Sequence, residues 1–257
     1  MIRNFIEQLW FRWSKIPTLE EALKKLPDGR LHIYSPLDFT IGELERKEGW
    51  VKEYNPKDPL FQSGRGYDPN LSDPKNIKIF QDKIELTQPK DEEKDAFIQS
   101  NFTFKHGTVR AIIKLPKVKG AWSAFWLFGE NGMPEHDILE QCGDWENKVS
   151  VTHHWGYDYN NVPNPRGKKM TRNNKRYNKN FRPTEDYYLY EVELSPYKVV
   201  YRINGIKVRT MKKGVSSSQQ RVIFSVTKGN YCQSKTTSIL KDDAAMSVKR
   251  LELWKII

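Results

Sequence analysis

Three carboxylates lie within one short strand-like segment, and they restrict what this chain can fold into. The segment runs from Pro134 through Glu135, Asp137 and Glu140, between the apolar run 124–128 and Gly143. This pattern predicts a buried strand that ends at a turn. Successive strand side chains point to opposite faces, so Glu135 and Asp137 share a face. In a regular strand Glu140 would point to the other face. A β-bulge would return Glu140 to that face, and bulges are frequent beside active sites.

Carboxyl groups gathered this closely do not all ionise freely, so the pKa of at least one is expected to rise. A protonated acid beside an ionised carboxylate is the pair that glycoside hydrolysis uses. Two carboxyls about 5–5.5 Å apart support double displacement with retention. The alternative is an exposed acidic strand without chemistry.

The segment resembles the bulged Glu-x-Asp-x-x-Glu signature of glycoside hydrolase family 16, which includes laminarinases, lichenases, agarases and carrageenases. The resemblance spans roughly residues 100–257 and continues in the strand-like runs 106–116, 120–127, 190–196 and 248–254. It implies Glu135 as nucleophile, Glu140 as general acid and base, and Asp137 as the residue that tunes the nucleophile. His136 departs from the family, which usually has an aliphatic residue there. We expect it to face away from the cleft and to pack or form a hydrogen bond.

The strand pattern in the rest of the chain predicts an all-β sandwich, and the resemblance implies a two-sheet antiparallel jelly roll of the concanavalin type, as one catalytic domain over residues 29–257. From Leu31 onward, short apolar runs alternate with clusters of Pro, Gly, Asn and Asp. The run 108–115 has two unlike faces and predicts a half-exposed strand, whereas 54–74 is expected to be irregular. Asn204-Gly205 predicts a hairpin with a type I′ turn.

Residues 1–28 form a short N-terminal extension with a helical pattern. Thr18 and Glu21 match a capping box, and Leu19, Leu23 and Leu26 recur at helical spacing. Two interpretations stay open. The extension packs on its own sandwich, or it docks to a partner through its aromatic residues, namely Phe5, Trp10, Phe11 and Trp13.

Several aromatic and histidine residues are candidates for binding substrate. Trp122 and Trp126 share one strand face, and the resemblance places them on the cleft side; a core pair is the alternative. The run 150–156 is similar to the family's strand opposite the catalytic one, so His154 and Trp155 are also candidates. His154 would bond an acid or the sugar, or serve as a structural histidine.

The chain is basic, with a formal net charge of +11 and a pI near 9.4, which favours anionic partners. One segment, 161–182, has no acidic residue and is expected to be a loop outside the core; its basic residues are Arg166, Lys168, Lys169, Arg172, Lys175, Arg176, Lys179 and Arg182. Arg166 and Lys168 are candidates for binding sulfate or carboxylate groups of an anionic glycan. A solvated loop is the alternative, and nucleic acid is disfavoured because no nucleic-acid module accompanies the charge.

No cofactor or metal is expected. Many relatives hold a calcium through an Asp in the last strand, but Lys249 occupies that place here, and an ammonium cannot ligate a cation. The two cysteines, Cys142 and Cys232, are too few for a disulfide scaffold. We expect them to be buried free thiols, and one bridge between them is the alternative.

The predicted function is a retaining endo-glycosidase that hydrolyses β-linkages in a polysaccharide, either an anionic galactan or a β-glucan. Transglycosylation would use the same residues. The alternative is a catalytically silent carbohydrate-binding or virion structural protein on the same fold. No run is long enough to span a bilayer and none resembles a signal peptide, so no membrane partner is expected. Cytoplasmic, virion-associated and secreted locations stay open.

Overall fold

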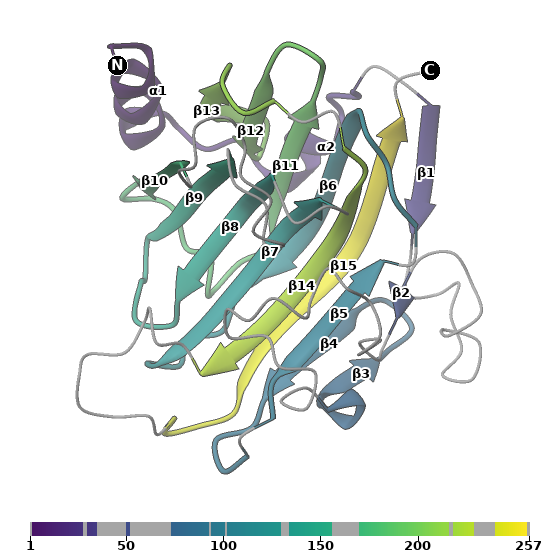
Figure 1. The fold of residues 1–257 in the computed structure, drawn as a ribbon. Coiled ribbons are helices and arrows are strands. Elements are labelled where there is room, and N and C mark those ends of the chain that lie inside the picture. The colour runs from purple at the N-terminus through teal and green to yellow at the C-terminus, as the bar shows by residue number, and fades with distance from the viewer. Residues whose placement is uncertain are drawn as a thin grey trace.

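Two antiparallel β-sheets stacked face to face make up the protein, seen in a computed structural model (Figure 1). The structure describes residues 2–27, 30–34, 50–51, 73–92, 94–100, 102–129, 134–155, 170–215, 218–228 and 240–255. This confirms the jelly-roll sandwich expected from the sequence. The predicted irregular segment, 54–74, lies almost entirely outside the described residues.

Sheet A has the strand order β13-β12-β11-β6-β15-β4-β3, with β1 beside β15. Its strands are β1 (Arg30–Tyr34), β3 (Ile77–Ile79), β4 (Ile84–Gln88), β6 (Gly107–Lys114), β11 (Tyr188–Leu194), β12 (Val199–Ile203), β13 (Ile206–Met211) and β15 (Ala244–Lys255). A single-turn 3-10 helix, η3 (Pro74–Asn76), precedes β3.

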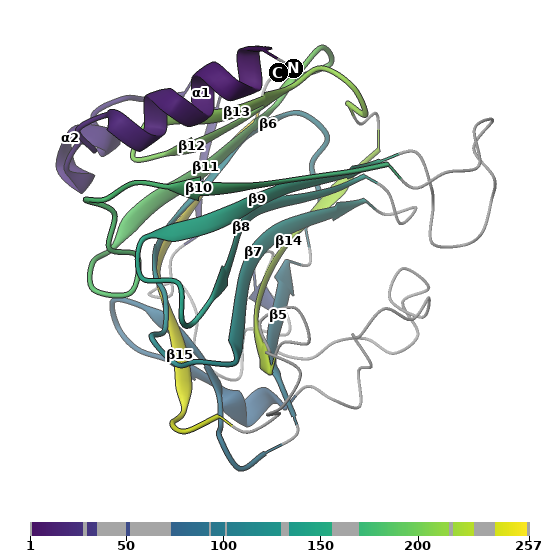
Figure 2. The same cartoon turned by 90° about the vertical axis from the view of Figure 1, so that its left-hand side faces the viewer.

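Sheet B has the strand order β10-β9-β8-β7-β14-β5-β2. Its strands are β2 (Trp50–Val51), β5 (Ala96–Ser100), β7 (Ala121–Gly129), β8 (Glu135–Cys142), β9 (Lys148–Trp155), β10 (Met170–Tyr177) and β14 (Gln220–Lys228). Figure 2 shows sheet B bending along its strands, with sheet A on its convex side. The concave face is therefore turned away from the main core.

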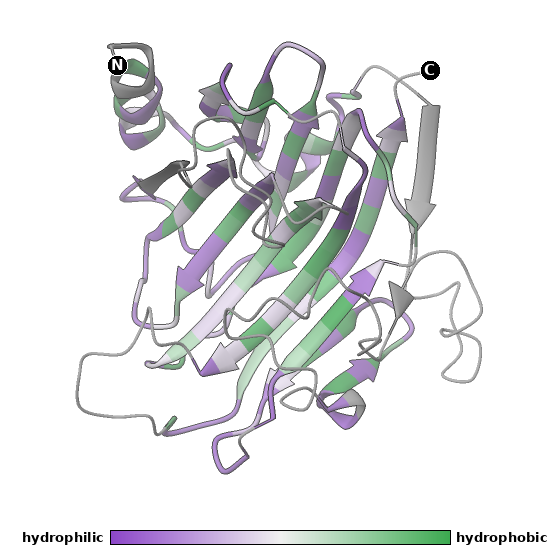
Figure 3. Ribbon diagram, viewed as in Figure 1, coloured by the Kyte–Doolittle hydropathy of each residue, from purple (hydrophilic) through white to green (hydrophobic). Residues whose placement is uncertain are grey.

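The main hydrophobic core lies between the sheets. Phe125 of β7 and Phe224 of β14 are direct cross-strand partners, and their rings stack at 4.6 Å. From sheet A, Val109 and Tyr190 are fully buried in the same cluster. Figure 3 shows hydrophobic residues concentrated along the middle strands of the sandwich. Burial of this surface is the main favourable contribution to folding.

The predicted N-terminal helices are α1 (Ile2–Trp13) and α2 (Leu19–Leu23). The capping box that starts α2 is confirmed, because Thr18 Oγ1 accepts from Glu21 N at 3.2 Å and Glu21 Oε2 accepts from Thr18 N at 2.8 Å. In α1, Phe11 is buried against Phe181 of the sandwich, whereas Trp10 and Trp13 are exposed.

Strand β6 corrects one expectation, since it is buried on both faces except at Lys114. Helix α2 covers the outer face, where Ala22 packs with Ile112 and Leu189. On the same face Arg110 pairs with the buried carboxylate of Glu252. Strand alternation alone could not reveal this, because the covering helix comes from a distant part of the chain.

The hairpin predicted at Asn204-Gly205 is confirmed. It joins β12 to β13, and both residues have positive φ, 45° for Asn204 and 76° for Gly205, as a type I′ turn requires. The Asn204 side chain also accepts from Leu189 N at 2.7 Å and donates to Pro17 O at 2.8 Å. The turn therefore helps to tie the N-terminal extension to sheet A.

The basic segment 161–182 is only partly the loop that we expected. Residues 170–177 form the edge strand β10, paired with β9, and the Arg176 side chain is fully buried. Burial and the nearby Arg209 lower the pKa of Arg176 to about 10, while Glu7 of α1 opposes this shift. The Glu7 carboxylate of α1 therefore favours the charged form of the buried Arg176.

Lys249 is the extra residue of a bulge in β15, where Val248 and Arg250 pair with consecutive residues of β6. Its ammonium lies 4.4 Å from the centre of the Tyr187 ring and 4.0 Å from Asp82 Oδ2. That calcium does not bind here stays a prediction.

Candidate active site

The bulge predicted in β8 is present. Asp137 pairs with Thr152 of β9, and Glu140 pairs with Ser150. Three steps along β8 therefore match two steps along β9. Glu135 pairs with His154, so each carboxylate lies opposite one of three alternate residues of β9. This register puts the three acids on the same face of sheet B.

Two side chains of β9 contact the acids. Thr152 Oγ1 donates a hydrogen bond of 2.7 Å to Glu140 Oε2. His154 Nε2 lies 3.3 Å from Asp137 Oδ2 and 3.8 Å from Glu135 Oε1. The even spacing of 150, 152 and 154 predicts their shared face, but the donation by Thr152 becomes visible only in the structure.

Burial and like charge act together on Glu140. Its pKa is raised to about 8, chiefly by burial and then by the charges of Asp137 and Glu135, while the Thr152 hydrogen bond opposes the rise. The Glu135 side chain is more accessible, 17% exposed against 6% for Asp137. The site therefore contains a carboxyl that is protonated at neutral pH beside two other carboxyls.

Tryptophans of β7 flank the acids. Trp126 pairs with Asp137 across the strands, and Trp122 pairs with Cys142. Trp126 belongs to a small hydrophobic cluster separate from the main core, made of Phe97, Ala124, Trp126, Phe128 and Ile223. It is only 4% exposed, whereas Trp122 is partly exposed. Both lie along the carboxylate face, and their contact with sugar stays a proposal.

The opposite face of β8 and β9 holds a buried polar cluster around His136 and His153. His136 Nδ1 lies 2.8 Å from His153 Nδ1 and 3.2 Å from the Tyr201 hydroxyl. His153 Nε2 lies 3.2 Å from Lys213 O, so this nitrogen carries the proton. Nδ1 of neutral His153 is then an acceptor, and His136 Nδ1 is the donor. His136 thus faces away from the acids, as expected.

Trp155 is not brought to the carboxylate surface, which differs from our expectation. It shares the face of His153, and its ring lies 5.1 Å from the His153 ring. It also packs against the main core. Trp155 lies three positions after Thr152, an odd offset, and strand side chains alternate between faces, so the two side chains point to opposite faces. Arg166 and Lys168 lie outside the described residues.

Cys142 is the last residue of β8, the strand that carries the three acids, and it is disulfide-bonded. The expectation of a free thiol at this position is therefore wrong. The chain's other cysteine, Cys232, lies outside the described residues. Sequence could not decide this, because a pair of cysteines gives no measure of the distance between them.

One group in the described part of the chain has donors suited to a metal ion. The ligand atoms of Glu135, Asp137 and His154 lie within 4.8 Å of one another. These are the groups that also carry the candidate chemistry, so a bound cation would compete with substrate.

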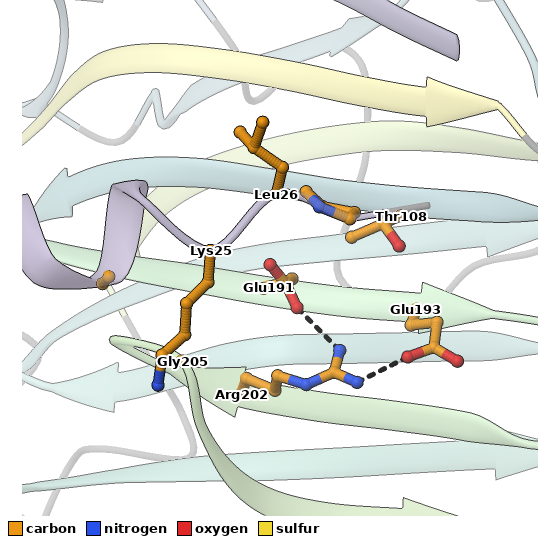
Figure 4. A pocket seen from close by; sticks show the side chains of 9 residues that line it. Lys25, Leu26, Thr108, Glu191, Glu193, Arg202 and Gly205 are labelled. Atoms are coloured by element: carbon orange, nitrogen blue, oxygen red, sulfur yellow. Dashed lines mark hydrogen bonds and ion pairs between the residues drawn. The ribbon is translucent and has the colours of Figure 1, made fainter. Parts of the chain in front are cut away.

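A cavity of about 310 Å³ lies on the outer face of sheet A, beside α2 (Figure 4). Arg202 and the two acids that line it are already paired, since Arg202 reaches Glu191 at 2.6 Å and Glu193 at 2.5 Å. It lies on the sheet that does not carry the three acids, and it brings no nucleophile and acid together.

The model of the family described as "Glycosyl hydrolases family 16" matches residues 66–243 of this chain. These residues include the three acids of β8 and the neighbouring strands β7 and β9. This chain belongs to that family. The match covers more than half of the 257 residues.

Individual family 16 relatives are distant. A protein of Arabidopsis thaliana described as "Probable xyloglucan endotransglucosylase/hydrolase protein 28" is 26% identical over 160 residues, which is 62% of this chain and 47% of that protein. The chain thus spans about half the length of this curated relative.

Solved family 16 structures share the fold. A Bacteroides ovatus mixed-linkage glucan protein in complex with its G4G4G3G product has a TM-score of 0.63 and 19% identity, covering 85% of this chain and 98% of that one. The laminarinase catalytic domain of Thermotoga maritima has a TM-score of 0.58 and 20% identity, covering 71% of this chain and 81% of that one.

No described helix is long and apolar enough to cross a membrane.

Proposed function

We propose that this protein is a retaining endo-glycosidase that cleaves β-linkages in a polysaccharide by double displacement. One observation carries the proposal: a buried Glu140 with a pKa raised to about 8 lies on the same sheet face as Glu135 and Asp137. A neutral acid and an ionised carboxylate on one surface match the two roles that the reaction needs.

In the first step, a Glu135 oxygen attacks the anomeric carbon as the glycosidic bond breaks. Glu140 gives its proton to the departing glycosidic oxygen, and the sugar stays on Glu135 as an ester. Asp137 lies between the two in sequence, and its charge favours the protonated form of Glu140. His154, 3.3 Å from Asp137, holds that carboxylate in place.

In the second step, Glu140 has lost its proton and acts as a base. It takes a proton from water, whose oxygen attacks the anomeric carbon and releases Glu135. The Thr152 hydrogen bond stabilises the ionised Glu140 of this step. If a sugar hydroxyl replaces water, the outcome is transglycosylation, the activity in the name of the Arabidopsis relative.

Two substrate classes follow from different observations. The names of the laminarinase and of the mixed-linkage glucan protein favour a β-glucan. The net charge of +11, with Arg166 and Lys168 in the basic segment, favours an anionic galactan. Trp122, Trp126 and His154 are the described residues that we propose for sugar contact.

The experiment is an assay of new reducing ends on a panel of β-glucans, agars and carrageenans, with Glu135→Gln as the matched inactive control. We expect one polymer class to be cut by the wild type and spared by the variant. The first product should keep the β configuration in proton NMR. Background signal from the wild type on every polymer would favour the silent binding or structural protein, and activity in Glu135→Gln would reject the assigned nucleophile.

A further inference from the structure

Over residues 6–13, whose side chains the structure describes, helix α1 turns a stripe of apolar side chains outward. Four large hydrophobic residues face solvent, with exposed fractions of 56% for Ile6, 39% for Leu9, 67% for Trp10 and 70% for Trp13. A surface helix normally buries such a stripe against the core. Among residues 6–13, the buried side chains are instead those of Phe11 and the acidic Glu7. A contiguous exposed apolar patch of this kind marks an interaction site.

Specific contacts fix this orientation. The Glu7 carboxylate accepts hydrogen bonds from Thr210 N at 3.0 Å and from Thr210 Oγ1 at 2.8 Å. Asn178 Nδ2 donates to Phe11 O and to Ser14 O, at 2.5 and 3.0 Å. The Phe11 and Phe181 rings meet edge to face at 5.8 Å. These contacts with Thr210, Asn178 and Phe181 hold the inner face of α1 against the sandwich. The apolar residues on the other face of the helix therefore point to solvent.

The exposed residues form a ridge with a shallow groove. The groove, of about 690 Å³, is lined by Ile6, Leu9, Trp10, Trp13, Ser14, Lys15 and Ile206. Figures 1 and 2 both show α1 at the outer edge of the molecule. A protruding helix of this shape can lie on a flat surface without hindrance from the sandwich.

The charges around the ridge are positive. The Arg12 guanidinium lies over the Trp13 ring at 5.3 Å and over the Tyr177 ring at 5.7 Å, and Lys15 lines the groove. The sole acid of α1, Glu7, is turned inward. Together with the net charge of +11, this favours a negatively charged partner.

We propose that this ridge, defined as Ile6, Leu9, Trp10 and Trp13 with Arg12 and Lys15, binds the surface of an anionic lipid membrane. Tryptophan rings favour the boundary between water and hydrocarbon. An interfacial helix lies flat there, with aromatic residues inserted and basic residues at the headgroups. The contact is peripheral, so the earlier expectation of no membrane partner, which rested on the lack of a spanning run, does not exclude it.

The test is co-sedimentation of the full chain with vesicles of phosphatidylcholine alone or mixed with phosphatidylglycerol. We compare the wild type with Trp10→Ser/Trp13→Ser and with Phe80→Ser. Phe80 is also exposed, at 41%, but follows β3 at the far edge of sheet A from β13, which α1 contacts. We expect the double variant to bind anionic vesicles at least about tenfold more weakly, and Phe80→Ser to bind like the wild type.

A second variant tests the charge. Arg12→Gln/Lys15→Gln should reduce binding to the anionic vesicles to the level seen with phosphatidylcholine alone. Absence of vesicle binding by the wild type, or equal binding by both the wild type and the tryptophan variant, would overturn the proposal. A dimer in light scattering that the tryptophan variant abolishes, without vesicle binding, would instead assign the ridge to self-association. Binding of the ridge to a polysaccharide, without binding to vesicles, would also overturn the proposal.

Discussion

Thr152 Oγ1 donates a 2.7 Å hydrogen bond to Glu140 Oε2, the buried carboxyl whose pKa is raised to about 8. The bond favours the ionised form, so it holds the pKa below the value that burial and the neighbouring charges would otherwise give. Thr152 therefore adjusts how easily Glu140 changes between acid and base. The two residues come from the neighbouring strands β9 and β8. Thr152 pairs with Asp137 before the bulge, and Glu140 follows the bulge.

Replacing Thr152 with Val should move the alkaline limb of activity to higher pH. The acid form of Glu140 is present below its pKa and is lost as pH rises through about 8. Without the hydrogen bond the acid form persists further, by about one pH unit. The measurement is kcat/KM against pH. Thr152→Ser keeps a hydroxyl and should restore the wild-type limb; an alkaline limb unmoved in Thr152→Val would contradict this role.

Glu140→Gln should lose activity according to how much the leaving group needs a proton. On polysaccharide we expect a fall of about 10²–10⁴ in kcat, the usual contribution of a general acid. On a nitrophenyl glycoside, whose leaving group departs without protonation, the first step should be nearly unaffected and should appear as a burst of nitrophenol. Equal losses on both substrates would exclude Glu140 as the acid.

Zinc should inhibit the enzyme reversibly. His154 Nε2 lies 3.3 Å from Asp137 Oδ2 and 3.8 Å from Glu135 Oε1, close to the separation of about 3.4 Å between tetrahedral zinc ligands. We expect EDTA to restore activity, and His154→Asn to weaken inhibition at least about tenfold by removing one ligand. His106→Asn, outside this site, is the matched control. Inhibition equally strong in His154→Asn would place the ion elsewhere.

The buried histidine pair should make the fold sensitive to acid. Burial lowers the pKa of His153 to about 3 and that of His136 well below its usual value. Above about pH 6.5 both are neutral in the folded and unfolded chain. Below it the unfolded chain takes up protons that the folded chain refuses. The free energy of unfolding therefore decreases as the pH is lowered below about 6.5. Each histidine contributes a loss of about 1.4 kcal/mol per pH unit, and for His153 this continues down to about pH 3.

A His136→Val/His153→Val variant tests this dependence, since β-branched residues suit a buried strand. Urea unfolding at pH 6.5 and 4.5 should give a smaller loss of stability for the variant than for the wild type. Both residues must change together, because one imidazole alone would lose its partner at 2.8 Å. Equal losses in the two proteins would mean that carboxylates elsewhere account for the acid sensitivity.

The sequence by itself determined the all-β fold, the capping box of Thr18 and Glu21, the hairpin at Asn204-Gly205 and the bulged strand that carries Glu135, Asp137 and Glu140. Each of these depends on residues near one another in the chain. Local backbone preferences and strand alternation therefore suffice to predict them.

Only the tertiary structure decided features made by distant segments. Helix α2 buries the outer face of β6, α1 brings Glu7 to Thr210, and β9 brings Thr152 to Glu140 and His153 to His136. The pairing of Cys142 and the burial of Arg176 belong to the same class. Burial and pKa depend on which surfaces meet across the fold, and spacing along a single chain does not encode that meeting.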